Sequence, residues 1–306
     1  MISFAKGVEK RPLKRLFYGP PGIGKSTVAS KCSTTSDVTF VPHDGVVALD
    51  GENGLWHIGT ARWPAEETWE KVLAQVKELC LAAGPWDTVL IDTVDAIEAK
   101  LVADVCATGG KKPVKTLTEF GYGDGFKAVG ERWREFLAVL DLATNKGREV
   151  HLVAHCAAKT INDPQTVESY RKLIGAMTTG SWAETFQRMD AVLFCDHAKV
   201  VKDGRMHMFD RRVMHTVSGM GFDAKHRPNI SPVLNLSWRD YESEVDSMTR
   251  SAQDIRTSIE GMIDKLPADA LEKVTALLSS TKSNDAGKLR AIERKVRERI
   301  VNEHGQ

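Results

Sequence analysis

Short apolar runs alternate with segments of helical spacing along the first 200 residues of the chain. Five of the runs are predicted to be strands, at residues 13–18, 46–50, 88–92, 150–154 and 191–195. Between them, apolar residues recur every three or four positions, which predicts helices over residues 66–83, 94–105 and 126–143. Strands that alternate with helices in this way indicate β–α–β crossovers. We therefore expect an α/β fold with a mainly parallel central sheet covered by helices.

Three stretches break this alternation. Residues 107–125 are rich in Gly, Lys and Thr and are predicted to form a mobile loop. Residues 157–169 are predicted to form a second loop, directly after the fourth strand. A β-hairpin is expected near residues 199–210, with Asp203-Gly204 as its turn. The α/β core is thus expected to carry two loops and a hairpin.

The pattern changes after about residue 243. From there the spacing is helical in three segments, residues 244–263, 267–279 and 284–301. The last segment has one apolar and one basic face, which favours either packing of the apolar face or contact of the basic face with DNA or an acidic partner. We prefer packing, and predict a domain over residues 1–243 followed by a small helical region over residues 244–306.

Charge and cysteine usage narrow the class of protein. In 306 residues, 42 Lys and Arg face 41 Asp and Glu, which excludes a uniformly basic nucleic-acid binder but allows local basic patches. The five cysteines are dispersed without a CxxC pair, so we expect neither a zinc knuckle nor a disulfide framework. No apolar stretch is long enough to span a membrane, and the first residues show no secretory signal. A cytoplasmic protein without a membrane partner is expected.

One motif carries specific chemistry. Residues 19–26, GPPGIGKS, match the phosphate-loop pattern GxxxxGK[ST], between a predicted strand and a predicted helix. Glycines let backbone N–H groups surround phosphate oxygens, and the helix that begins near Lys25 adds the positive end of its dipole. Lys25 would reach the β- and γ-phosphates, and the Ser26 hydroxyl would hold Mg²⁺, so we expect ATP and Mg²⁺ as ligands. The nucleotide-binding residues are expected to be Gly19, Pro20, Pro21, Gly22, Ile23, Gly24, Lys25, Ser26 and Thr27.

Two acidic residues at predicted strand ends complete this site. Asp92 ends the strand DTVLID and would orient Mg²⁺ through water. In many AAA+ ATPases a Glu directly follows this acid, whereas here the position is Thr93. Glu52 follows the strand at 46–50, at the ligand edge of an open α/β sheet, so we predict that it is the general base. The alternative is a solvated loop glutamate.

The order of these segments resembles that of the RecA-like ATPases, in which a Glu after the strand following the phosphate-loop helix activates water. More narrowly, the chain is similar to the phage-type AAA-domain nucleotide-binding proteins, short RecA-like ATPases that include single-strand annealing recombinases of bacteriophages. The matching segments are YGPPGIGKST, LDGENG, WDTVLIDTVD, FGYGDGF and VHLVAH, within about residues 14–156. The resemblance implies a RecA-like P-loop ATPase of the host cytoplasm that acts on single-stranded DNA in recombination or replication. It also implies a homo-oligomeric ring or filament, with a single-strand binding protein as a further partner.

The resemblance also implies roles for three further residues. His155, after the strand at 150–154, matches the polar sensor of the γ-phosphate; the alternative is a strand-end histidine satisfied by the backbone. The segment AKHRPN, residues 224–229, resembles the lysine/arginine finger of RecA-like hexamers such as the DnaB helicases. Lys225 and Arg227 would then reach the γ-phosphate in a neighbouring subunit, and an exposed basic pair is the alternative. Only about 14 residues precede the first strand, so we expect annealing, loading or remodelling rather than full strand exchange.

Basic residues with aromatic neighbours are candidates for single-strand binding, because they combine phosphate contacts with base stacking. The candidates are Lys111, Lys112, Lys115 and Tyr122 in the first predicted loop and Arg171 and Lys172 after the second. In RecA-like folds the comparable loops face the central DNA channel. Ordinary solvated loops are the alternative.

Two other classes of protein also bind nucleotides through a phosphate loop and remain as alternatives. A small-molecule P-loop kinase is disfavoured, because the chain shows no Arg-rich lid segment and carries the finger-like pair Lys225 and Arg227. A nucleotide-dependent binding switch without significant turnover is the other alternative. Absence of hydrolysis by the wild type would favour the switch.

Overall fold

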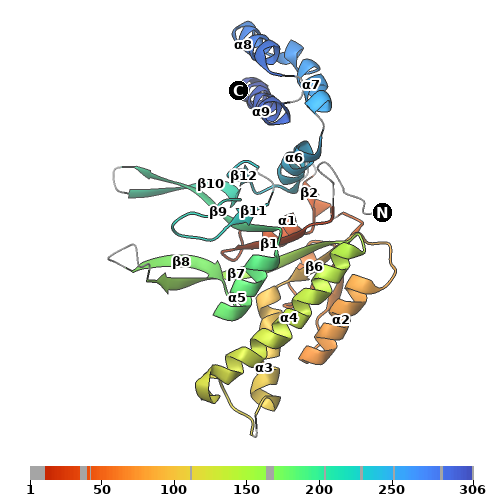
Figure 1. Cartoon of the computed structure of the whole chain (residues 1–306), viewed down its shortest axis with the longest axis vertical. Coiled ribbons are helices and arrows are strands. Elements are labelled where there is room, and N and C mark those ends of the chain that lie inside the picture. Colours follow the sequence, from red (N-terminus) through yellow and green to blue (C-terminus); the bar gives the residue numbers. More distant parts are fainter. Residues whose placement is uncertain are drawn as a thin grey trace, which may run out of the picture. The chain divides into compact units, whose positions relative to one another are not determined.

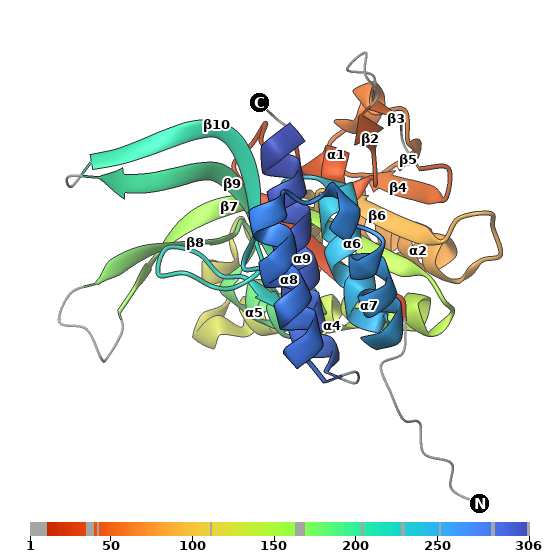
Figure 2. The same ribbon diagram turned by 90° about the horizontal axis from the view of Figure 1, so that it is seen from above.

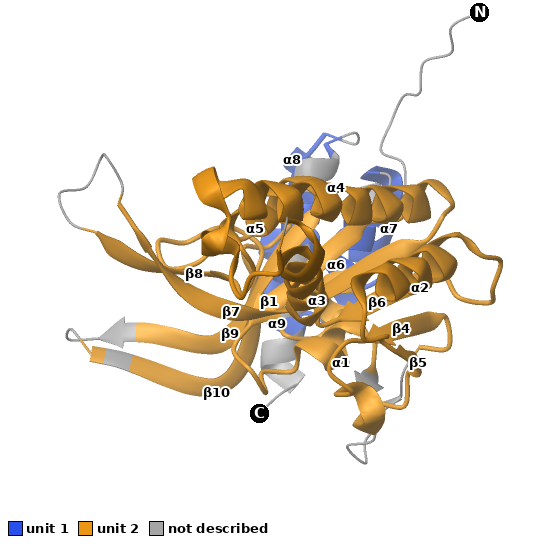
Figure 3. Cartoon of the chain, turned by 90° about the horizontal axis from the view of Figure 1, so that it is seen from below, with its two compact units in different colours: residues 1–10, 243–306 blue, residues 11–242 orange. Residues whose placement is uncertain are grey.

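The computed structural model (Figure 1) describes residues 11–34, 40–41, 43–110, 112–162, 169–202, 205–227, 230–250, 252–282 and 285–304. The chain forms two compact units, one of residues 11–242 and one that contains residues 243–306 (Figure 3). The larger unit contains the sheet, and the smaller contains the helices of the tail.

A mainly parallel sheet lies at the centre of the larger unit, in the strand order β12-β10-β9-β1-β7-β6-β4-β5. Its parallel strands are β1 (Lys14–Gly19), β4 (Val46–Asp50), β5 (Ala61–Pro64), β6 (Thr88–Asp92), β7 (Glu149–Ile161) and β9 (Ala191–Lys202). One end of the sheet carries β10 (Arg205–His215), β11 (Lys225–His226) and β12 (Val233–Asn235). The predicted α/β class is confirmed, with a strand at each of the five predicted positions.

Helices cover both faces of the sheet. The helices on one face are α2 (Trp69–Leu81), α3 (Val94–Thr108), α4 (Asp124–Asn145) and α5 (Thr179–Arg188) (Figure 3). Because successive strand residues point to opposite faces, Leu16 and Tyr18 belong to the core under these helices, whereas Phe17 meets His151 on the other side. That second face is covered by α1 (Lys25–Ala29) and by the first turn of α6 (Trp238–Thr249). None of the described helices is long and apolar enough to cross a membrane.

The predicted second loop is mostly strand. β7 continues to Ile161 and pairs antiparallel with β8 (Tyr170–Gly175), so the prediction of a loop from residue 157 is wrong. The signal was missed because a ribbon exposed beyond the sheet has no continuous apolar run. The predicted hairpin of β9 and β10 is present, with Lys202 paired to Arg205, and its predicted turn Asp203-Gly204 lies outside the described residues. The two antiparallel pairs, β7 with β8 and β9 with β10, extend beyond the rest of the sheet in the same direction (Figure 2).

The predicted first loop is also partly ordered. α3 continues to Thr108, and short 3-10 turns follow at Leu117–Glu119 and Gly121–Gly123. Thr116 and Glu119 form a capping box, and Leu117 is buried in the main core. A further small sheet, missed by the apolar pattern, pairs β2 (Ser33–Thr34) with β3 (Phe40–Val41).

The smaller unit is a helical cluster of its own. Its helices after the end of α6 are α7 (Ala252–Glu260), the 3-10 turn Ile263–Lys265, α8 (Ala268–Ser280) and α9 (Ala286–His304). The predicted continuous helix over residues 244–263 is instead the end of α6 and α7. The apolar stripe of α9 is buried with Ile255 and Ile259, as its spacing predicts. Glu293 of α9 is buried too and accepts hydrogen bonds from Arg250 (2.8 Å) and Ser258 (2.7 Å).

A buried histidine links strand β7 to α1. His151 Nδ1 lies 2.6 Å from the carbonyl oxygen of Ala29, and Nε2 lies 3.1 Å from Arg15 Nη1. Because a carbonyl only accepts and a guanidinium only donates, the ring is neutral with its proton on Nδ1. Burial and the charge of Arg15 lower the pKa of His151 to about 3.

This neutral histidine predicts acid sensitivity. Between pH 6.5 and pH 3 the unfolded chain binds a proton at His151 that the folded chain does not, so the free energy of unfolding falls as the pH is lowered. The contribution is up to about 1.4 kcal/mol per pH unit. Urea unfolding at pH 7 and pH 5 measures it, and His151→Gln, which keeps a donor and an acceptor, should show a smaller difference. Equal pH dependence in the two proteins would contradict the assignment.

Candidate active site

The carboxyl ends of four parallel strands meet at one edge of the sheet. Gly19, the last residue of β1, is level with His155 of β7. Asp50, the last residue of β4, is level with Asp92 of β6. The segments that follow these strands therefore share one edge, which is where open α/β sheets bind ligands.

The phosphate loop depends on two of its glycines. A Cβ on Gly19 would lie 2.1 Å from the carbonyl oxygen of Cys195, so only glycine allows this approach to β9. Gly24 has a φ of +107°, a conformation that L-residues with side chains rarely adopt. The Lys25 ammonium donates to the carbonyls of Gly19 (3.1 Å) and Pro20 (2.8 Å), and burial lowers its pKa. The cation is thus held against the backbone of the loop that would surround the phosphates.

Asp92 and Ser26 form a fitting site for Mg²⁺. Ser26 lies close enough to Asp92 to lower its pKa, and the buried Oδ2 of Asp92 has no hydrogen-bond partner among the described residues. Burial raises the pKa of Asp92 to about 6, and the nearby carboxylates of Asp50 and Glu52 add to the rise, while Ser26 and Lys25 oppose it. A divalent cation would offset this cost of the charge, and hydroxyl and carboxylate oxygens are ligands that Mg²⁺ prefers. Bound there, Mg²⁺ would neutralise charge on the β- and γ-phosphates.

The loop that carries Glu52 is fixed by its neighbours. Asp50 is buried and accepts hydrogen bonds from the backbone N–H groups of Gly54 (3.0 Å) and Leu55 (3.1 Å). The N–H of Gly51 donates to the carbonyl of Asp92 (2.6 Å), which ties the loop to the end of β6. Glu52 therefore projects from a closed turn, with its own side chain 43% exposed.

Thr93 orients the carboxylate of Glu52. Its hydroxyl donates to Glu52 Oε1 (2.8 Å) and also caps α3 by accepting from the N–H of Ala96 (3.4 Å). Thr93 thus occupies the position directly after Asp92 and orients Glu52, which follows the neighbouring strand β4.

His155 is held by an acid that the sequence analysis missed. Its Nδ1 lies 2.9 Å from Asp95 Oδ2, and its backbone N–H donates to Asp95 Oδ1 (3.0 Å). Glu52 Oε1 is 3.6 Å from the same nitrogen, and the ligand atoms of the three residues lie within 4.8 Å of one another. With Asp95 accepting at Nδ1, Nε2 remains for a ligand. The available signal was the position of Asp95, three residues after Asp92 in the first turn of α3.

Lys225 and Arg227 do not join this group. β11 pairs with the first residues of β9, so Lys225 is level with Leu16, three residues or about 10 Å before Gly19. Lys225 lies over the ring of Phe186 and donates to the carbonyl of Gln187 (3.0 Å). Arg227, half exposed, forms an ion pair with Asp190 (3.1 Å). Neither residue is placed to meet a nucleotide bound in the phosphate loop of its own chain.

The predicted DNA contacts lie in two places. Lys112, Lys115 and Tyr122 are exposed on the connection between α3 and α4, and Arg171 is exposed on β8. Lys172, next to Arg171, is instead ion-paired with Asp223 (2.6 Å). Lys111 lies outside the described residues.

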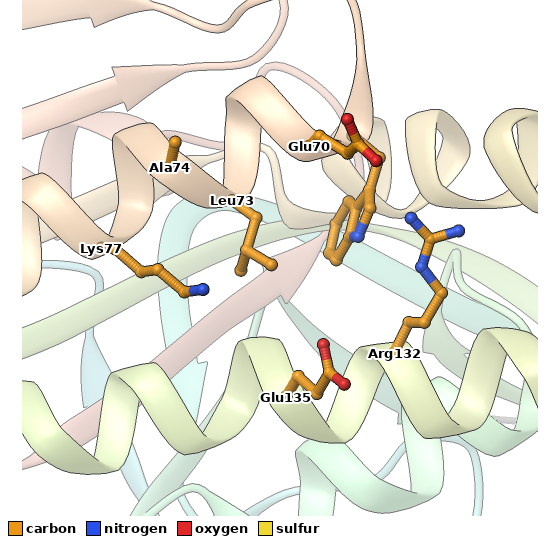
Figure 4. Close-up of a pocket in the computed structure, with 7 residues that line it drawn as sticks. Glu70, Leu73, Ala74, Lys77, Arg132 and Glu135 are labelled. Atoms are coloured by element: carbon orange, nitrogen blue, oxygen red, sulfur yellow. The ribbon is translucent and has the colours of Figure 1, made fainter.

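A hollow of about 350 Å³ lies between α2 and α4 and contains none of the predicted site residues (Figure 4). Its lining includes the nearly fully buried Trp69 and the charged residues Glu70, Lys77, Arg132 and Glu135. Its mixed charges offer no convergent set of catalytic groups.

Comparison with known proteins agrees with the geometry at the sheet edge. A family model described as "AAA domain" matches residues 11–228, which is most of the chain. The chain belongs to the AAA domain family. This AAA domain protein is also 33% identical over 115 residues to the proteasome-activating nucleotidase of Sulfurisphaera tokodaii. The match covers 37% of the chain and 26% of that relative, so the chain spans about a quarter of the relative's length. Membership in the family indicates a nucleotide-binding ATPase that uses ATP.

Removing the loop cation should weaken nucleotide binding strongly. In Lys25→Ala the phosphates lose a buried charge-assisted donor, which corresponds to roughly a 10- to 150-fold rise in Kd or more. Titration with a fluorescent ATP analogue measures the change, with Lys77→Ala on the exposed side of α2 as the control. An unchanged Kd for Lys25→Ala would show that the nucleotide does not occupy this loop.

Proposed function

We propose that this AAA domain protein hydrolyses Mg-ATP at the sheet edge and acts as a homo-oligomer on single-stranded DNA. One observation supports the hydrolysis: Glu52 lies at the sheet edge where the phosphate loop begins, held at 2.8 Å by Thr93 and 3.6 Å from His155, which is level with Gly19. A carboxylate that is oriented on one oxygen and open to solvent suits a general base.

The geometry supports a direct attack by water. Glu52 takes a proton from the water, whose oxygen forms a bond to the γ-phosphorus while the bond to the bridging β–γ oxygen breaks. ADP leaves with the bridging oxygen, and the proton passes from Glu52 to the phosphate products. Lys25 offsets the charge of the phosphates, and His155, held by Asp95, offers Nε2 to the γ-phosphate.

Oligomerisation would complete the site. Lys225 and Arg227 lie away from their own phosphate loop, at the start of β9, so a contribution to catalysis requires a second subunit. The resemblance of AKHRPN to a finger segment supports this arrangement. A ring or filament would place the finger of one subunit at the nucleotide of the next.

Single-stranded DNA is the polyanion that the exposed groups suit. Tyr122 is fully exposed and has a φ of +54°, an uncommon conformation for a residue with a side chain. It presents an aromatic ring on the same connection that carries the exposed Lys112 and Lys115, while Arg171 adds a cation on β8. Such groups bind a single strand by stacking and phosphate contacts. Annealing or loading in phage recombination or replication, with a single-strand binding protein as a partner, is the setting that the family resemblance suggests.

ATPase activity measured with and without single-stranded DNA tests the proposal. We expect phosphate release that rises with DNA, together with DNA binding that weakens as salt increases. Tyr122→Ala should lower the DNA-stimulated rate while the basal rate stays unchanged. Turnover without DNA stimulation and without salt-sensitive binding would rule out the DNA role.

Two alternatives make different predictions. A small-molecule kinase would transfer the γ-phosphoryl group to a metabolite and would need no second subunit. A binding switch would bind ATP without turnover. The fixed carboxylate of Glu52 favours turnover over the switch, which needs no general base. The finger-like pair Lys225 and Arg227 favours hydrolysis over the kinase, which needs no second subunit.

A further inference from the structure

Arg212 of β10 lies beside the phosphate loop and has no role in the mechanism above. A methyl group placed on Gly24 would lie 3.5 Å from Arg212 Nη1 and 3.5 Å from Leu236 Cδ2. The side chain of Arg212 is exposed, and among the described residues none forms an ion pair or hydrogen bond with its guanidinium. A guanidinium without an anionic partner, beside a loop with a phosphate-binding sequence, suits an anionic ligand.

Local backbone structure places Arg212 there. The register of β10 against β9 shifts between Met208 and Arg212, and such bulges change the direction in which a side chain points. The carbonyl of Arg212 accepts from the N–H of Leu236 (3.0 Å), so the two residues near Gly24 are fixed to each other. The adjacent Arg211 is used differently, because its Nε donates to Asn235 Oδ1 (2.9 Å).

The strand order decides which part of a nucleotide would meet Arg212. Glu52 follows β4 and Asp92 ends β6, and both strands lie on one side of β1 in the sheet. Arg212 belongs to β10, two strands away on the other side of β1. Because the γ-phosphate must lie near the general base and the Mg²⁺ ligand, the remainder of the nucleotide extends past the loop toward β9 and β10.

We propose that Arg212 binds the α-phosphate of the nucleotide and that Leu236 packs against its nucleoside. The inference rests on the proposed function in placing a nucleotide in the phosphate loop with its γ-phosphate toward Glu52 and Asp92. Since the α-phosphate is common to ATP and ADP and does not react, Arg212 contributes equally to both ligands and to the ground and transition states.

Calorimetric titration of ATP and ADP into Arg212→Ala tests this, with Arg211→Ala as the matched control. We expect the Kd of both nucleotides to rise by about 10- to 100-fold in Arg212→Ala and by less than about 3-fold in Arg211→Ala. The KM for ATP should rise by a similar factor, while kcat changes by less than about 3-fold. Arg212→Lys, which keeps the charge without the planar fork, should give a smaller loss and serves if the alanine variant does not fold.

The outcomes separate the inference from the proposed function. Wild-type affinities for both nucleotides in Arg212→Ala, or a loss for ATP alone, would overturn the α-phosphate contact while leaving hydrolysis intact. Equal losses in Arg211→Ala and Arg212→Ala would overturn it as well. A loss confined to Arg212 in a protein without turnover would support the contact and reject the ATPase proposal. Absence of nucleotide binding by the wild type would reject both.

Discussion

Glu52→Gln should bind ATP with nearly unchanged affinity and lose hydrolysis by about 10²- to 10⁴-fold, the range of general-base catalysis. The amide oxygen of glutamine still accepts the hydrogen bond from the Thr93 hydroxyl, so the side chain keeps its place. What is lost is the capacity to take a proton from water. Phosphate release under saturating ATP measures kcat, and a fluorescent ATP analogue measures Kd.

The matched control for this substitution is Glu67→Gln, an exposed glutamate on the segment before α2. Its kcat should equal that of the wild type. If Glu52→Gln hydrolyses ATP at the wild-type rate, Glu52 is a solvated loop residue and another group activates the water. If the wild type itself shows no turnover, the binding switch becomes the better function.

Arg227→Ala should retain ATP binding and lose about 10³- to 10⁵-fold in kcat, as expected when an arginine finger is removed. The reason is that a finger meets charge that develops only in the transition state. Single-turnover hydrolysis and analogue binding separate the two effects. Arg11→Ala is the control, because Arg11 and Arg227 both form an ion pair with Asp190 Oδ1. A similar loss in Arg11→Ala would mean that Arg227 acts through Asp190 as a structural residue.

Mixing two inactive variants tests the subunit boundary directly. Glu52→Gln subunits keep the finger, and Arg227→Ala subunits keep the general base. A mixed oligomer therefore contains interfaces that join an intact base to an intact finger, and hydrolysis should partly return. No recovery in an oligomer that is shown to be mixed would place Arg227 outside the active site of its neighbours.

Local sequence patterns predicted most of the α/β core. The strands β4 and β6 and the first part of β9 carry continuous apolar runs because both faces of a parallel sheet are buried. The exposed antiparallel pair of β7 and β8 is not predicted by the apolar pattern, because backbone hydrogen bonds hold the two strands together and their side chains form no buried apolar run.

The residues of the candidate site differ in how far the sequence predicts them. The phosphate loop is a local motif, since its glycines and Lys25 act within one turn of chain. Asp95 and Thr93 were not predicted as site residues, because their roles depend on where β4 and β7 end relative to β6. Arg212 was missed for the same reason, as it comes from a strand nearly 190 residues beyond the loop.

The phosphate-loop motif, the acids Asp92 and Glu52 at strand ends and the α/β class are all predicted from the chain's local pattern, because each depends on contiguous residues or on simple periodicity. Which side chains share the sheet edge depends on how distant segments of the chain pair in the tertiary structure. That pairing brought Thr93 to Glu52 and Asp95 to His155, and it placed Lys225 and Arg227 away from their own phosphate loop. Strand order and register set these relations, and they arise from pairing between segments far apart in the chain, which no local pattern encodes.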